Sequence, residues 1–269
     1  MSRCIVWIFL LAFLPFGLLE VLANPVDVGF RVGSGQRVPG RLDSNLGQFS
    51  SSFNPFVFSD INLSGGKDTA TYEGFIRLHL DSTSKFGLTV GRQDLSKLAL
   101  TEVTSDAYLT KLNSEIFSYH LLLTYHFVTP LTRNLEWENG LGMGFTSADW
   151  QIRGYSLGGI DNPAFFLQRG NFRGNGLAFR LETAINQRLG ETNYIQFGLG
   201  YHHIAIAGFA GNYNGEASSI YLGSNGQVGV FDDTRVLDVN LSTAQNLRRL
   251  DMNSGSWNLY FSIVQRFLD

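Results

Sequence analysis

The connections between the strands that the sequence predicts alternate between long and short along the whole chain. Tight turns are expected near 82–84, 129–132 and 189–192, and long loops at about 36–69, 95–115, 150–174 and 207–255. An up-and-down barrel in an outer membrane has short turns on one side and longer loops on the other. A soluble sandwich has no reason to sort its connections in this way. The alternation therefore favours a membrane barrel.

The predicted strands themselves have a period of two, as the C-terminal segment 257–267 shows. One face of this segment carries Trp257, Leu259, Phe261 and Ile263, and the other carries Asn258, Tyr260, Ser262 and Arg266. Alternation of this kind indicates a strand with unlike surroundings on its two sides. Seven similar segments precede it, beginning at about 25–35. We predict an all-β fold, an antiparallel up-and-down transmembrane β-barrel of eight strands.

A ten-stranded barrel is the alternative. Within 207–255, the apolar residues of 220–222 and 235–241 flank a turn at 224–226 and would supply one more hairpin. That hairpin would bring Asp232, Asp233 and Asp238 into the membrane, where carboxylates are costly. Eight strands are therefore favoured.

The first 23 residues are typical of a secretory signal peptide. Arg3 precedes an apolar run from Cys4 to Leu19, and Ala23 stands at the expected cleavage point. A single membrane anchor is disfavoured because Pro15 and Glu20 interrupt a run that is already short. We therefore expect an exported protein whose barrel occupies 24–269.

Composition narrows the functional classes. The single cysteine of the chain lies inside the predicted signal peptide, so the exported part has no disulfide and no thiolate nucleophile or ligand. The formal net charge is −3, which does not indicate a nucleic-acid partner. Nor does any phosphate-binding loop or metalloprotease motif appear. We predict no cofactor and no bound metal.

Charged residues fall on the predicted inward faces of the strands. They are Glu73, Arg77, His79, Glu136, Glu138, Arg180, Glu182 and Arg266. The interior of an eight-stranded barrel is only wide enough for side chains to fill. We expect these groups to form an ionic plug; the alternatives are a narrow ion-conducting lumen or a Glu136–Glu138 carboxylate pair for acid–base chemistry.

Two adjacent histidines, His202 and His203, stand at the end of a predicted strand, and Glu216 follows across a loop. They are weak candidates for a catalytic site. Neighbouring residues of a strand point to opposite faces, and a zinc site usually needs three well-placed protein ligands, so a metal site is not expected here.

The layout as a whole resembles small outer-membrane barrels of the OmpA transmembrane-domain and OmpX kind. This resemblance lies in architecture and covers the whole exported chain. It implies insertion into the outer membrane of a Gram-negative-type bacterium, with the long loops outside.

A second, local resemblance concerns the stretch from His203 to Glu216. It is similar to the lipid A 3-O-deacylases, barrel enzymes whose site runs His-x-Ser-Asn-Ala-Gly with a Glu after the next loop. Here Ala205 takes the place of the serine nucleophile and Ile206 that of the asparagine. Without a serine hydroxyl the His–Glu pair has nothing to activate. The resemblance implies a related barrel that has lost its activity.

The function expected from these features is that of a non-enzymatic outer-membrane protein whose surface loops serve interaction or membrane integrity. The partners expected are outer-membrane lipid, lipopolysaccharide and an extracellular or host-surface ligand that contacts the long loops. The alternatives are a narrow channel and an inactive deacylase-like barrel.

Overall fold

The structure is a computed structural model that describes residues 24–38, 40, 59–62, 68–103, 109–158, 164–222, 228–232 and 248–267. The predicted signal peptide and residues 235–241 of the alternative hairpin lie outside this described part. Among the described residues, no helix is long and apolar enough to cross a membrane.

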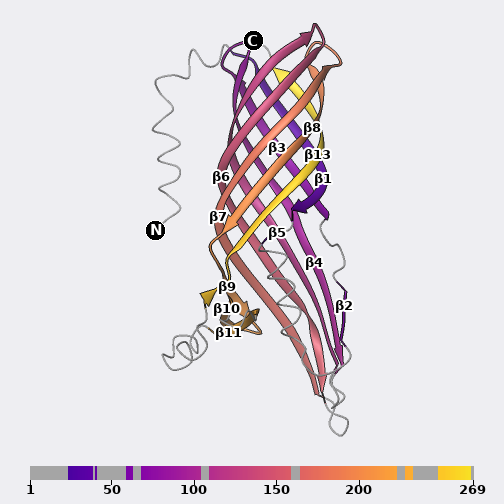
Figure 1. Ribbon diagram of the computed structural model, residues 1–269, viewed down its shortest axis with the longest axis vertical. Coiled ribbons are helices and arrows are strands. Elements are labelled where there is room, and N and C mark those ends of the chain that lie inside the picture. The colour runs from indigo at the N-terminus through magenta and orange to yellow at the C-terminus, as the bar shows by residue number, and fades with distance from the viewer. Residues whose placement is uncertain are drawn as a thin grey trace.

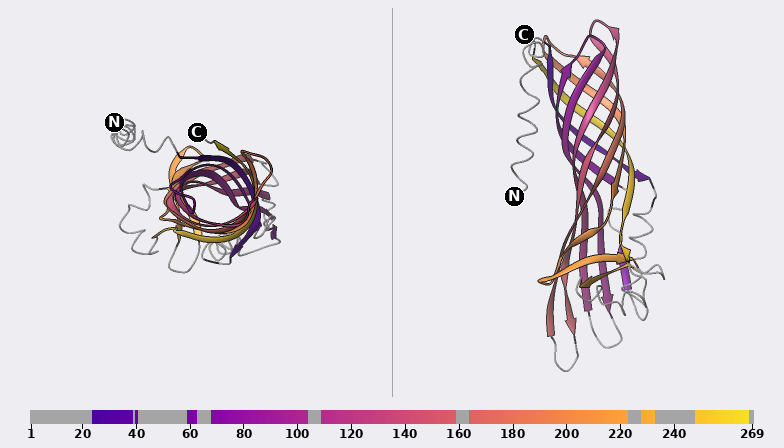
Figure 2. Two further views of the ribbon diagram at one scale, coloured as in Figure 1. Left: turned by 90° about the horizontal axis from the view of Figure 1, so that it is seen from above. Right: turned by 90° about the vertical axis from the view of Figure 1, so that its left-hand side faces the viewer.

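Eight antiparallel strands form a closed barrel (Figure 1). They are β1 (Val26–Val38), β3 (Asp68–His79), β4 (Ser84–Val103), β5 (Leu109–Thr132), β6 (Leu135–Gly158), β7 (Ala164–Arg188), β8 (Asn193–Ile206) and β13 (Met252–Phe267). The seam lies between the first and last strands, from Val26 opposite Phe267 to Val38 opposite Gly255. The predicted eight-stranded barrel is confirmed, and a view along its axis shows the complete ring (Figure 2).

Among the described residues, five short strands lie outside the ring. β2 (Ser59–Asn62) pairs with β4, while β9 (Phe209–Tyr213), β10 (Glu216–Leu222), β11 (Val228–Asp232) and β12 (Arg248–Arg249) form an attached sheet next to β7. The hairpin of β10 and β11 does not enter the wall, because β8 pairs directly with β13. The ten-stranded alternative is therefore wrong.

The strands extend further than the sequence pattern predicts. β4 and β5 leave only 104–108 between them, and β6 and β7 leave only 159–163, so most of the expected loops at 95–115 and 150–174 is paired strand. The expected loop at 207–255 contains β9 to β12 and the start of β13. At the opposite end, the turn between β5 and β6 is at 133–134 instead of 129–132. We call that opposite end, with its turns at 80–83, 133–134 and 189–192, the short-turn end.

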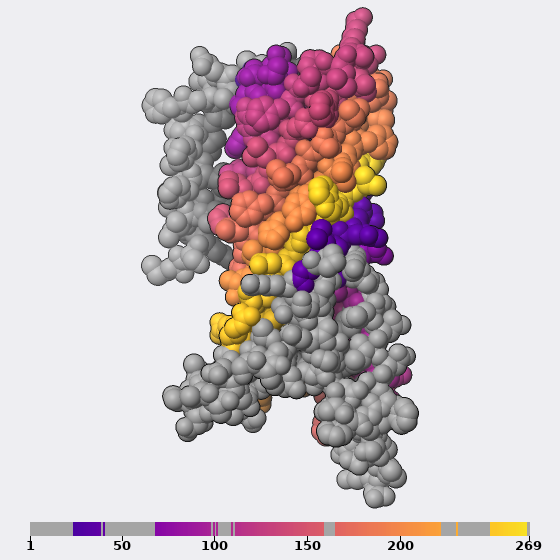
Figure 3. All heavy atoms as spheres, in the orientation of Figure 1, coloured from indigo at the N-terminus to yellow at the C-terminus, as the bar shows by residue number. Residues whose placement is uncertain are grey.

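A belt of exposed apolar side chains surrounds the part of the wall next to the short-turn end. It includes Phe30, Ile76, Leu88, Leu123, Met143, Phe179, Phe197 and Ile263, which are 42–62% exposed. The inner faces of the same strands are polar. An apolar exterior around a polar interior is typical of a barrel whose wall faces lipid. Figure 3 shows the tilted strands of this wall packed side by side.

Beyond the belt, the apolar residues change sides. On β5, Leu112 and Ile116 are buried inside the barrel, whereas Lys111 and Glu115 face outward and are exposed. β6 and β7 change in the same way. The same alternate positions of each of these strands face inward along its length. What changes is the type of residue at those positions: inward residues are mostly polar beside the belt and apolar beyond it, and outward residues change in the opposite sense.

This second part of the barrel has a hydrophobic core. Trp150 and Phe209 meet edge to face, with ring centroids 5.5 Å apart, and neither is accessible to solvent. Inner-face residues of β4 to β8 and β13 join them, together with Ile220 of β10 and Leu250. We call this cluster the apolar cap. β9 and β10 lie across the end of the ring that this cluster fills (Figure 2).

Glycines make room for large side chains inside the barrel. A Cβ atom on Gly91 would lie 2.5 Å from the Glu73 side chain, 2.7 Å from the Tyr72 carbonyl oxygen and 2.8 Å from the His120 ring. A Cβ atom on Gly74, on the outer face, would have no neighbour within 4 Å.

We therefore expect Gly91→Ala to lower the free energy of unfolding by about 1–3 kcal/mol, because a methyl group overpacks the interior. Gly74→Ala is the matched control and should change it much less. Urea unfolding in lipid vesicles, followed by tryptophan fluorescence, measures both. Equal losses in the two variants would contradict this account.

Candidate functional site

The structure places all eight predicted charged residues on the inner face of the barrel. Glu73, Arg77, Glu138, Arg180 and Glu182 are at most 8% exposed. His79, Glu136 and Arg266 lie nearer the short-turn end and are partly accessible.

The centre of the lumen holds a group of arginine–glutamate pairs. The Arg77 guanidinium donates to Glu138 at 2.5 Å and to Glu182 at 3.1 Å. Arg31 donates two hydrogen bonds to Glu182, at 2.5 and 3.1 Å, and its guanidinium lies 3.8 Å from the Tyr260 ring centroid. These contacts join β1, β3, β6 and β7 across the interior.

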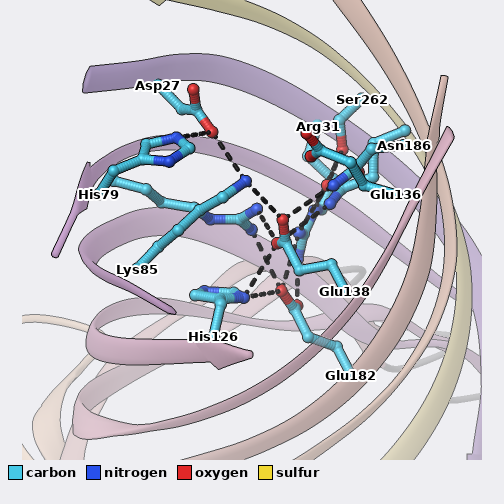
Figure 4. Close-up of polar contacts among 12 residues, drawn as sticks. Asp27, Arg31, His79, Lys85, His126, Glu136, Glu138, Glu182, Asn186 and Ser262 are labelled. Carbon is cyan, nitrogen blue, oxygen red and sulfur yellow. Dashed lines mark hydrogen bonds and ion pairs between the residues drawn. The ribbon is translucent and has the colours of Figure 1, made fainter. Parts of the chain in front are cut away.

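Toward the short-turn end, the network continues through a lysine. The Lys85 ammonium donates to Asp27 at 2.9 Å and to Glu138 at 2.8 Å. Asp27 also accepts from Arg266 at 2.8 Å and lies 3.0 Å from His79. Figure 4 shows Asp27, His79, Lys85 and Glu138 converging from several strands.

Toward the apolar cap, the network ends in histidines. Glu73 pairs with Arg180 and lies 2.8 Å from the His120 Nε2 atom. The His120 ring meets the His202 ring edge to face at 4.8 Å, and His202 Nδ1 lies 2.9 Å from the Gln93 amide oxygen. His202 is thus a lumen residue that closes the polar network below the cap.

The charges in this network balance among the described residues. Five carboxylates (Asp27, Glu73, Glu136, Glu138 and Glu182) are paired with five cations (Arg31, Arg77, Lys85, Arg180 and Arg266). Burying an ion without a partner costs several kcal/mol. The pairing of every carboxylate is therefore what makes this interior tolerable.

One trio in the network has metal-ligand geometry. His126, Glu138 and Glu182 offer ligand atoms within 4.8 Å of one another. However, Arg77 binds both carboxylates, and Lys85 binds Glu138. Because these fixed cations already occupy the carboxylate oxygens and would repel a metal ion, we assign no metal to the trio.

The sequence-based selection omitted several members of the network. They are Asp27, Arg31, Lys85, His120 and His126, all of which are at most 4% exposed. Each occupies an inward position in the two-residue alternation of its strand. A selection of every polar residue at the inward-facing positions of the predicted strands would have found them.

The histidine–glutamate candidates do not come together. His203 follows His202 on β8 but lies on the opposite face of the wall, and its partner on β7 is Phe179. Glu216 is exposed at the start of β10, next to the point where β9 pairs with Gly170 of β7. On β7, Phe179 beside His203 is nine residues from Gly170 near Glu216, which is roughly 30 Å of strand.

The cavities that the described residues line in the lumen are small. A cavity of about 20 Å³ lies beside His202 and Tyr260, and another of about 10 Å³ lies beside Asp27 and Lys85. Each has room for about one water molecule. The charged network and the apolar cap therefore fill the barrel in succession along its axis.

Comparisons with known proteins give structural likeness only. No known family profile and no curated protein sequence matches the chain. Its fold is similar to that of the attachment invasion locus protein Ail of Yersinia pestis, which was solved in complex with the heparin analogue sucrose octasulfate. The two chains are 8% identical, with a TM-score of 0.35, and the match covers 91% of this chain and 99% of Ail. The outer membrane protein OprG of Pseudomonas aeruginosa is 11% identical, with a TM-score of 0.37 and coverage of 92% and 97%. The outer membrane protease OmpT of Escherichia coli is 6% identical, with a TM-score of 0.41 and coverage of 91% and 97%.

The ion network predicts a strong coupling between its members. Arg180→Gln should cost about 3–5 kcal/mol of unfolding free energy, because it removes a main partner of the buried Glu73 carboxylate. The double variant Arg180→Gln/Glu73→Gln should lose at least about 1 kcal/mol less than the sum of the two single variants. Urea unfolding of all four proteins tests this. Additive losses would show that the pair is not coupled.

Proposed function

We propose that this protein is an integral outer-membrane barrel of a Gram-negative-type bacterium, exported by its N-terminal signal segment. Its barrel is closed to ions and has no catalytic role, and it holds an interaction surface outside the membrane. The observation that carries this proposal is the continuation of the wall beyond the apolar belt as a packed, water-facing structure.

The extent of this continuation supports a role outside the membrane. On β6, the last exposed apolar residue of the belt is Phe145, and the strand continues to Gly158. That distance is roughly 40 Å of strand. A protein whose task is confined to the membrane has no use for such an extension, whereas a protein that contacts an extracellular ligand does. Acyl chains and lipopolysaccharide would surround the belt and its outer rim.

The filled interior disfavours the channel alternative. An ion entering from the short-turn end would meet the paired charges around Lys85 and Glu138, and beyond them the apolar cap around Trp150. The cavities that described residues line in the charged layer hold about one water molecule each, which is too little for a continuous water-filled path. The deacylase-like alternative is also disfavoured, because Ala205 stands in place of the serine nucleophile and a long stretch of β7 separates His203 from Glu216.

Protein reconstituted in planar bilayers should therefore give no conductance steps. Folding of the same sample should be verified by its slower electrophoretic mobility before heating than after. Regular single-channel steps from verified, folded protein would refute the closed barrel.

The topology can be tested by labelling introduced cysteines on intact cells in a Cys4→Ser background. Ala217→Cys is exposed on β10, and Gly190→Cys lies in a turn of the short-turn end. A membrane-impermeant maleimide should label the first on intact cells and the second only after the outer membrane is permeabilised. The reverse pattern would place the extension inside the cell envelope.

A further inference from the structure

Two arginines face each other at the far end of the longest hairpin of the wall. Arg153 of β6 lies directly opposite Arg169 of β7, and both are exposed on the outer face. Like charges that are directly opposite on antiparallel strands destabilise the pair. The arrangement therefore carries a cost that a bound anion would relieve.

These arginines have no carboxylate partner among the described residues. The Arg153 guanidinium donates to the Gly170 carbonyl oxygen at 2.8 Å and to the Asn171 side-chain oxygen at 2.6 Å, both of which are neutral. The acid Asp149 on the same face is already paired with Arg173, at 2.6 Å. The positive charges of these two arginines are thus not neutralised by a described carboxylate.

A third cation and an aromatic pair complete the surface. Lys111 of β5 lies opposite Tyr155 of β6, next to Arg153, and is exposed. The Tyr155 ring stacks on Phe165 of β7 with centroids 5.7 Å apart and an interplanar angle of 26°. Phe165 is 59% exposed and its neighbour Leu167 is 50% exposed. We call Lys111, Arg153, Tyr155, Phe165 and Arg169 the tip face.

We propose that the tip face binds an anionic polysaccharide. Sulfate or carboxylate groups would be held between Arg153 and Arg169, because guanidinium groups present paired donors that match such planar or tetrahedral anions. A sugar ring would pack its C–H face against Phe165, the exposed member of the aromatic pair. This inference rests on the proposed function, since it requires the hairpin to project outside the cell.

The combination of groups favours a saccharide over other anions. The phosphates of the protein's own membrane would lie at the edge of the belt, whereas Arg153 is eight residues beyond Phe145 along β6, roughly 25 Å of strand. An acidic peptide would be matched by the cations alone and would leave the exposed Phe165 ring unused. Exposed apolar side chains rimmed by polar groups commonly mark interaction sites.

Purified full-length protein in detergent should bind dextran sulfate and not neutral dextran, as measured by isothermal titration calorimetry. The variant Arg153→Gln/Arg169→Gln should raise the dissociation constant by at least about tenfold. Its unfolding midpoint should stay the same or rise, because the substitution removes a like-charge pair. Retained affinity in this variant would overturn the assignment.

The matched control is Arg173→Gln/Arg248→Gln, which removes the same charge from two exposed arginines that are paired with Asp149 and Asp251. It should change the dissociation constant by less than about threefold. An equal loss in the control would show a general charge effect and overturn the site.

The aromatic part of the site has its own test. Tyr155→Ala/Phe165→Ala should weaken binding of dextran sulfate but leave binding of polyglutamate unchanged. Equal binding of polyglutamate and dextran sulfate by the unaltered protein would overturn the saccharide assignment. These titrations use purified protein, so they do not depend on which way the protein is oriented in the cell. If dextran sulfate binds but the cysteine-labelling pattern is reversed, the proposed function is refuted and this inference stands. If the labelling pattern is as expected but dextran sulfate does not bind, this inference is refuted and the proposed function stands.

Discussion

Closure of the backbone ladder is the constraint on which the rest of the structure depends. A wall that faces lipid has no water to satisfy its peptide groups, so each strand must pair on both sides. The seam between β1 and β13 completes this requirement, over thirteen residue pairs from Val26 opposite Phe267 to Val38 opposite Gly255. The hairpin of β10 and β11 stays outside the wall because the ring is already complete without it.

A closed ring of eight strands fixes what the interior must contain. The space suits side chains and little else, so every charged group there needs a partner within reach. Arg77 and Lys85 each contact two carboxylates, which links strands far apart in the sequence. Glycines such as Gly91 leave the room that these long side chains occupy. Stability and a filled interior thus follow from the same packing.

The barrel also passes from one environment to another along its axis. Where the outer face is apolar the lumen is charged, and where the outer face is polar the interior becomes the apolar cap around Trp150. This exchange lets the wall continue beyond the apolar belt as a β structure with its own core. The tip face at the end of β6 and β7 is therefore held on a stiff paired support instead of a free loop.

The sequence by itself determined an up-and-down β-barrel and the inward position of residues such as Glu73 and Arg77, because a period of two reports the two faces of a strand directly. It favoured eight strands over ten, and the direct pairing of β8 with β13 decided the number. The sequence did not show how far the strands extend. On β5 most of the apolar residues face outward from Phe117 onward and inward before it. A strand predicted from one unbroken alternation of apolar and polar residues therefore begins at Phe117 and misses the earlier part. Only the tertiary structure decided which inward charges pair, that the apolar cap fills the ring, and that Arg153 faces Arg169. These depend on cross-strand register and on contacts between strands distant in the sequence, which a pattern along a single strand does not contain.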